Sequence, residues 1–193
     1  MPGTLAVPDG PGQHAAVLLL AGSGSLDRDE TIGRNKPFKD IAWGLASRGI
    51  ATLRFDKVTY AHAQELRDAH DFTLADEYLP AAIAAIKLLE QHPAWLETAF
   101  FCSDPVEVAA SLGKPMLILQ GGRDYQVTVA DDLARWKTGL GDQPTVTIRV
   151  YPDHNHLFTP SSGPSSPEEY EPAQQVDATV IADIAAWLAT IPR

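Results

Sequence analysis

Two ionisable side chains stand just beyond strand-like segments in the C-terminal half of the chain. Residues 116–120 form an apolar run that leads through Gly121 to Asp124, and residues 146–151 form a second run that leads to His156. Runs of this length that end in turn-forming residues predict β-strands. Ligands bind at the carboxyl edge of parallel sheets, and a carboxylate behind an imidazole makes that imidazole a competent general base. Asp124 and His156 are therefore the first candidates for catalysis.

A turn rich in glycine and serine follows the apolar run at residues 15–20. Its glycines let the backbone turn sharply and present N–H groups to an anion. We therefore expect Gly22, Ser23 and Gly24 to bind an oxyanion or substrate, and Ser23 is also a candidate nucleophile. Arg28 follows this turn and is a candidate for lining the same site. Cys102 has apolar neighbours, which favour a packed, protonated thiol over a nucleophile.

The sequence Asp153-His154-Asn155-His156 offers a second chemistry. Nitrogen and oxygen ligands of this kind suit zinc or a similar divalent metal, and a metal-bound hydroxide would remove the need for a serine. In this alternative Asp153, His154 and His156 are metal ligands, whereas the leading interpretation needs no cofactor. A third interpretation is a non-catalytic remnant or a small-molecule binding module, in which Asp124 and His156 only bond each other.

Composition limits the classes of partner. The chain has 193 residues, is 45% hydrophobic and carries a formal charge of -10, so we expect one globular domain and no nucleic-acid partner. The longest apolar run, residues 15–21, falls short of the roughly 20 residues of a membrane span. A single cysteine and an N-terminus without a secretory signal pattern favour a cytoplasmic location. The expected partner is a small-molecule substrate.

The elements that must position these residues alternate between strand and helix. We predict a short strand before the turn at residues 8–12, strands at 15–20 and 50–55, and helices at 38–47 and 74–89, the second capped by Thr73. The site strands at 116–120 and 146–151 are separated by a helix at 131–140, and a helix at 176–191 ends the chain. This alternation predicts an α/β fold with a doubly wound, mostly parallel sheet flanked by helices.

The segment 92–114 interrupts the alternation. We expect one short helix over residues 94–102 and a second over 104–112, with Asp104 as its cap and Pro105 at its first position. Within a single domain, residues 1–91 would form an N-terminal half with the oxyanion turn. Residues 92–114 would then be a helical junction, and residues 115–193 a C-terminal half with the acid and histidine loops.

These motifs resemble the α/β-hydrolase superfamily, in particular its dienelactone-hydrolase and acyl-peptidase-like esterase branch. Residues 18–57, with Ala-Gly-Ser-Gly-Ser and Arg-Phe-Asp-Lys, resemble the strand and oxyanion loop that open the family's sheet. Residues 115–188, with Gly-Gly-Arg-Asp-Tyr-Gln-Val and Asn-His-Leu-Phe, resemble its acid strand, histidine loop and final helix. The resemblance implies that Asp124 is the triad acid, that His156 is the triad base, and that the backbone at Ser23 and Gly24 forms the oxyanion hole.

The chain departs from the family at one point, because it has no Gly-x-Ser-x-Gly nucleophile turn. We therefore expect a truncated fold that lacks the central nucleophile strand. Such a gap would leave unpaired sheet edges, which predicts a homodimer. The leading hypothesis is a hydrolase of small ester or lactone-like substrates, with Ser23 or water as the attacking group. The alternatives are a metal-dependent hydrolase of esters or phosphoesters and the non-catalytic module.

Overall fold

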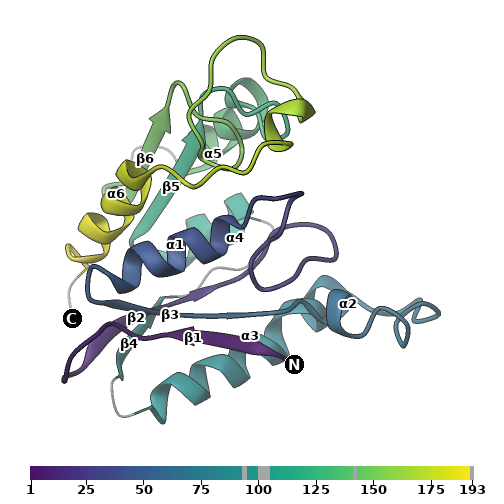
Figure 1. Ribbon diagram of the computed structural model, residues 1–193, viewed down its shortest axis with the longest axis vertical. Coiled ribbons are helices and arrows are strands. Elements are labelled where there is room, and N and C mark those ends of the chain that lie inside the picture. The colour runs from purple at the N-terminus through teal and green to yellow at the C-terminus, as the bar shows by residue number, and fades with distance from the viewer. Residues whose placement is uncertain (93–94, 100–104, 141–142, 192–193) are drawn as a thin grey trace. The chain divides into compact units, whose positions relative to one another are not determined.

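The computed structural model of the protein describes residues 1–92, 95–99, 105–140 and 143–191 (Figure 1). The chain divides into two compact units, Met1–Cys102 and Ser103–Pro192.

The first unit is built on a four-stranded sheet in the order β1-β3-β2-β4. Its strands are β1 (Gly3–Ala6), β2 (His14–Leu19), β3 (Ile50–Phe55) and β4 (Trp95–Ala99). β2 runs parallel to β3 and to β4, whereas β1 pairs with β3 in the antiparallel sense. The helices are α1 (Pro37–Ala46), the short α2 (Val58–Ala61) and α3 (Leu74–Glu90). α1 and α3 lie on opposite faces of the sheet (Figure 1), which is the doubly wound arrangement.

The core of the first unit lies between the sheet and α3. Every residue of β3 is buried, including the polar Thr52 and Arg54, and the strand has a neighbour on each side in the sheet. α3 begins at a capping box in which the Thr73 side chain accepts from the Asp76 N–H and the Asp76 carboxylate accepts from the Thr73 N–H. The buried side chains that pack together are Ala16, Leu18, Ala51, Leu53, Phe55, Ala82, Ala85 and Leu89.

The second unit carries a parallel pair of strands, β5 (Met116–Gly121) and β6 (Val146–Tyr151). The two strands pair in register from Met116 opposite Val146 to Gly121 opposite Tyr151, so they end at the same edge. The remaining elements are α4 (Pro105–Leu112), a π-turn η1 (Val129–Leu133) that leads into α5 (Ala134–Leu140), a 3₁₀ turn η2 (Pro167–Tyr170) and α6 (Ala178–Leu188). The expected mostly parallel sheet with flanking helices is thus confirmed, here as two separate sheets.

One prediction for the junction was wrong. Residues 95–99, expected to be helical, form β4, which pairs in parallel with β2. The edge of β2 carries backbone N–H and C=O groups that require partners, and this pairing overrides local helix propensity. The second predicted helix is present as α4, whereas its proposed cap, Asp104, and Cys102 lie outside the described residues. Among the helices of the described residues, none is long and apolar enough to span a bilayer.

Candidate active site

Asp124 lies in the turn that follows β5. Its carboxylate is bound by hydrogen-bond donors of the protein in place of water. Its Oδ1 accepts from the backbone N–H groups of Gln126 and Val127, each at 2.9 Å. Gln120 Nε2, at the end of β5, lies 3.4 Å from Oδ2. Burial raises the pKa of the Asp124 carboxyl, but the hydrogen bonds from His156 and the Val127 N–H outweigh it and leave the pKa below its usual value. Asp124 therefore stays ionised at neutral pH.

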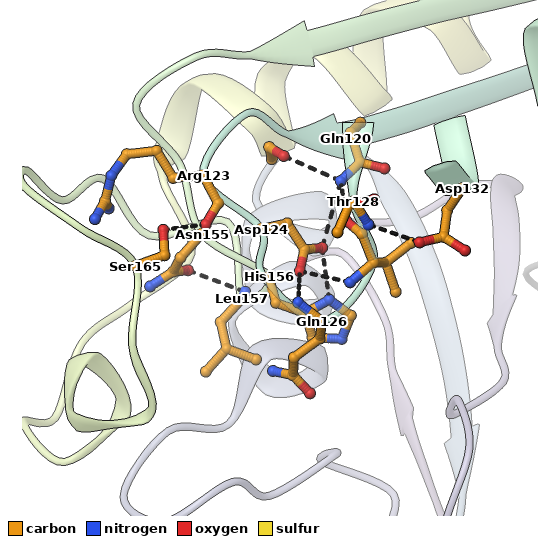
Figure 2. Close-up of polar contacts among 12 residues, drawn as sticks. Gln120, Arg123, Asp124, Gln126, Thr128, Asp132, Asn155, His156, Leu157 and Ser165 are labelled. Atoms are coloured by element: carbon orange, nitrogen blue, oxygen red, sulfur yellow. Dashed lines mark hydrogen bonds and ion pairs between the residues drawn. The ribbon is translucent and has the colours of Figure 1, made fainter. Parts of the chain in front are cut away.

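His156 follows β6 and meets Asp124 directly. Its Nδ1 lies 2.8 Å from Asp124 Oδ2, and Figure 2 marks this contact with a dashed line. The Asp124 side chain is only 5% exposed, whereas the imidazole is 35% exposed. A carboxylate at Nδ1 selects the tautomer with the proton on Nδ1, which leaves the lone pair on Nε2. The arrangement places a buried acid behind a partly exposed imidazole, which is the geometry of a general base.

Two glycines allow the acid and histidine turns to approach each other. A Cβ on Gly121 would lie 2.4 Å from the Asn155 carbonyl oxygen, and one on Gly122 would lie 2.7 Å from Pro152 Cα. The backbone N–H of Arg123 donates to the His154 carbonyl at 2.9 Å and joins the two turns. The Gly-Gly pair before the acid is therefore required by packing, because any side chain there would separate the turns.

A buried asparagine shapes the turn that carries His156. Asn155 is fully buried, and its Oδ1 accepts from the Leu157 N–H at 3.0 Å and from the backbone and hydroxyl of Thr159 at 3.2 and 3.0 Å. Sequence reasoning did not single out this residue. Asparagine beside a histidine in a turn segment is a usable signal, because such side chains bond the backbone a few residues ahead.

The glycine-serine turn lies in the first unit, whereas the Asp124–His156 pair lies in the second. Gly24 has a φ of +96°, which glycine adopts without strain, and the Ser23 side chain is exposed. The N–H of Gly22 donates to Glu30 Oε1 at 2.8 Å, so Gly22 does not present its N–H to a substrate here. The oxyanion and nucleophile roles of Ser23 stay predictions.

The carbonyl side of this turn is anchored by a buried lysine. Lys57 Nζ donates to the Gly22 carbonyl at 2.8 Å and to Tyr78 Oη at 3.0 Å. Tyr78 in turn donates to the Ala21 carbonyl at 2.9 Å. These contacts fix the turn from the sheet side and leave Ser23 facing outward.

Arg28 binds a neighbouring carboxylate. Its Nε and Nη2 each donate to Asp56 at 2.9 Å, and its backbone N–H adds a third bond at 2.8 Å. This bidentate pair contributes to the wall of a polar cavity of about 270 Å³ in the first unit. The role of Arg28 in substrate binding stays a prediction. The cavity is lined by Thr4, Asp27, Arg28, Asp29, Lys39, Arg54, Asp56 and Tyr60.

The two histidines of the His-x-His pair bind different carboxylates. His154 Nε2 lies 3.1 Å from Asp177 Oδ2, at the start of α6, and its ring packs against Tyr151 with centroids 5.3 Å apart. Across the described ranges, no group of three or more His, Cys, Asp or Glu side chains is arranged to hold a metal. The metal interpretation, with Asp153, His154 and His156 as ligands, therefore has no described cluster to support it.

Comparison with known sequences gives one informative relative. No family model matches the chain. Esterase EstD of Thermotoga maritima is 30% identical over 272 residues, which take in 97% of this chain and 65% of that protein. The chain therefore spans slightly less than two thirds of the relative's length. Because the aligned stretch is longer than this 193-residue chain, the relative carries residues within it that have no counterpart here.

Solved structures give the fold. An α/β serine hydrolase without a lid from Xanthomonas campestris has a TM-score of 0.50 and 20% identity, over 81% of this chain and 80% of that one. A Klebsiella pneumoniae protein assigned as a dienelactone hydrolase has a TM-score of 0.56 and 18% identity, over 98% of this chain and 93% of that one. Together with the parallel strands and their flanking helices, these likenesses show that the chain has an α/β-hydrolase fold, in a shortened form.

Proposed function

We propose that the protein hydrolyses small carboxylic esters or lactone-like substrates, with His156 as the general base and Asp124 as the residue that orients it. The observation that carries the proposal is the 2.8 Å contact between His156 Nδ1 and the buried carboxylate of Asp124. The names of the relatives, an esterase and two hydrolases, support ester cleavage as the class of reaction.

The proposed step is a proton transfer coupled to attack on a carbonyl. His156 Nε2 takes a proton from water or from the Ser23 hydroxyl as its oxygen bonds to the carbonyl carbon. The imidazolium then returns the proton to the departing alcohol as the C–O bond breaks. Asp124 remains ionised throughout and compensates the charge on the ring. A positioned base of this kind contributes roughly 10²–10⁴-fold to the rate.

The attacking group divides the proposal into two forms. With Ser23 as nucleophile, an acyl-enzyme forms on its hydroxyl, and a water deprotonated by His156 then attacks the acyl carbon, so that the acid leaves and Ser23 regains its proton. Mass spectrometry of the quenched reaction detects the added acyl mass on the peptide that contains Ser23. With water as nucleophile, no adduct accumulates and Ser23→Ala retains turnover. This measurement assigns the nucleophile independently of the role of His156.

The test of the function is hydrolysis of a panel of aryl esters and lactones by the wild-type protein and by His156→Ala. We expect the variant to lose about 10²-fold or more of kcat/KM, because no base then accepts the proton. His70→Ala is the matched control, since His70 is an exposed histidine of the first unit. Undiminished turnover by His156→Ala would refute the assignment.

A chelator arm tests the metal-dependent alternative in the same assay, with phosphotriesters added to the panel. The acid–base mechanism predicts that dialysis against a chelator leaves aryl ester turnover unchanged. Activity lost on dialysis and restored by zinc would favour hydrolysis through His154 and His156 instead.

A further inference from the structure

The 3₁₀ turn η2 places two neighbouring side chains, Glu169 and Tyr170, against the turns that carry the acid and the base. Both side chains come from a segment far along the chain from Asp124. Glu169 is about 10% exposed at its side chain, and Tyr170 is 8% exposed. A carboxylate buried to this degree requires partners, so its contacts indicate what holds it there.

Glu169 contacts the residue that precedes the acid. Its Oε1 forms an ion pair with Arg123 Nη2, and Ser161 Oγ donates to the same oxygen at 3.1 Å. Arg123 also donates through Nη2 to the Gly163 carbonyl at 2.7 Å, and its own carbonyl accepts from Ser165 Oγ (Figure 2). The Arg123 side chain is thereby fixed on one side of the acid turn.

Glu169 also reaches the residue that precedes the base. Asn155 Nδ2 lies 3.5 Å from Glu169 Oε2, and Asn155 shapes the turn of His156 through its own oxygen. One carboxylate therefore touches both Arg123, next to Asp124, and Asn155, next to His156. Burial raises the pKa of Glu169, but the Arg123 and Ser161 hydrogen bonds hold it below its usual value, so the Glu169 carboxylate is ionised.

Tyr170 holds the other side of the acid turn. Its hydroxyl accepts from Gln126 Nε2 at 3.1 Å, and its ring stacks on Tyr125 with centroids 6.0 Å apart. The backbone N–H of Gln126 is one of the two that bind Asp124 Oδ1. η2 thus contacts the acid turn on both sides of Asp124 and the base turn at Asn155.

We propose that Glu169 is a positioning residue, which holds Asp124 and His156 in register by clamping Arg123 and Asn155. The proposal rests on the function proposed above for its kinetic consequence, but the geometry it predicts is independent of turnover. Catalytic groups must be held closely, since a displacement of about 1 Å costs on the order of 10²-fold in rate.

The test compares Glu169→Gln with Glu168→Gln. Both substitutions remove one negative charge from η2, but Glu168 is exposed and its carboxylate is hydrogen-bonded to Ser166, the residue just before η2. One readout is the downfield proton NMR resonance of the His156 Nδ1–H bonded to Asp124, assigned by its loss in His156→Ala. The other is aryl ester hydrolysis, resolved into kcat and KM.

We expect Glu169→Gln to lose or broaden the resonance and to lower kcat by about 10- to 100-fold with KM little changed, because only orientation is impaired. Glu168→Gln should match the wild type in both readouts. If Glu169→Gln retains the resonance and kcat, the positioning role is overturned while the hydrolase proposal stands. If the wild type shows the resonance but no ester turnover, the hydrolase proposal fails. The resonance of Glu169→Gln then tests the positioning role of Glu169 by itself.

A second variant covers the case in which Glu169→Gln does not fold. Arg123→Lys keeps a cation beside Glu169 but lacks the planar fork that binds Gly163 and Glu169 together. A folded Arg123→Lys protein that loses the His156 resonance supports the clamp. One that retains the resonance and wild-type kcat contradicts it.

Discussion

At the scale of single residues, the contacts of Asp124 affect the stability of the protein in acid. The two backbone N–H groups and His156 stabilise its charged form, and the same contacts lower its pKa. Glu169, Asp56 and Asp29 also have lowered pKa values in the folded protein, because each is hydrogen-bonded to a basic side chain. In an unfolded chain these carboxyls titrate near their ordinary values, about 3.9 for Asp and about 4.3 for Glu.

We therefore predict that stability falls steeply below about pH 4. The unfolded chain takes up protons there while the folded protein resists them, so protonation favours unfolding. Stability from these groups is full above the unfolded pKa and is lost as the pH falls through the folded values. Urea unfolding at pH 7, 5, 4 and 3 measures the effect, and Asp124→Asn should show a shallower acid loss than the wild type. An unchanged midpoint across this range would contradict the prediction.

At the scale of the elements, the close approach of the turns after β5 and β6 is the most demanding feature of the site. The backbone of Gly121 passes so near the Asn155 carbonyl that no side chain fits between them. The sheet register brings both turns to the same edge, and the glycine lets them touch.

We predict that Gly121→Ala destabilises the protein by about 1–3 kcal/mol, the usual effect of overpacking a tight contact. Because the added methyl pushes against the histidine turn, ester turnover should fall as well. Chemical denaturation gives the free energy of unfolding, and the aryl ester assay gives the rate. Wild-type values in both would show that the turns adapt without strain.

The elements that the sequence predicted well are those with strong local signals. β5 and β6 follow from strand-length segments rich in apolar residues that end in turn-forming residues, and α3 follows from the Thr73 capping box. β4 was missed, since its strand form depends on pairing with β2, far away in the chain. η2 was also missed, because the local sequence of its segment is typical of a loop. The contact of Glu169 with Arg123, 46 residues earlier, is a long-range one that no local pattern indicates.

The candidate site was predictable in part. The types and placement of Asp124 and His156 at strand ends were enough to expect their contact, and the structure places them 2.8 Å apart. Arg123 and Asn155 stand inside the two loop motifs, but the motifs do not indicate what their side chains contact, and Glu169 belongs to no motif. The Ser23 acylation measurement tests whether Ser23 is the nucleophile.

At the scale of the whole molecule, the strands form two sheets, one in each compact unit. In the part of the chain that the structure describes, β4 pairs only with β2, and β5 and β6 pair only with each other. Unpaired strand edges promote association between chains. These unpaired edges are the reason why we propose a homodimer.

We predict that the protein is a dimer at micromolar concentration. Sedimentation or size-exclusion chromatography with light scattering measures the mass directly, against 20.8 kDa for one chain. Dilution should produce monomers if edge pairing is weak. A monomer mass at all micromolar concentrations would remove the proposal.

The register of β5 against β6 has an evolutionary consequence. Both strands end opposite each other, so the number of residues in each turn sets where Asp124 and His156 lie. An insertion or deletion of one residue in either turn would therefore separate the carboxylate from the imidazole. Natural length variation among descendants of this gene should therefore accumulate in other loops. In an alignment of such sequences, these two turns should show substitutions but no insertions or deletions.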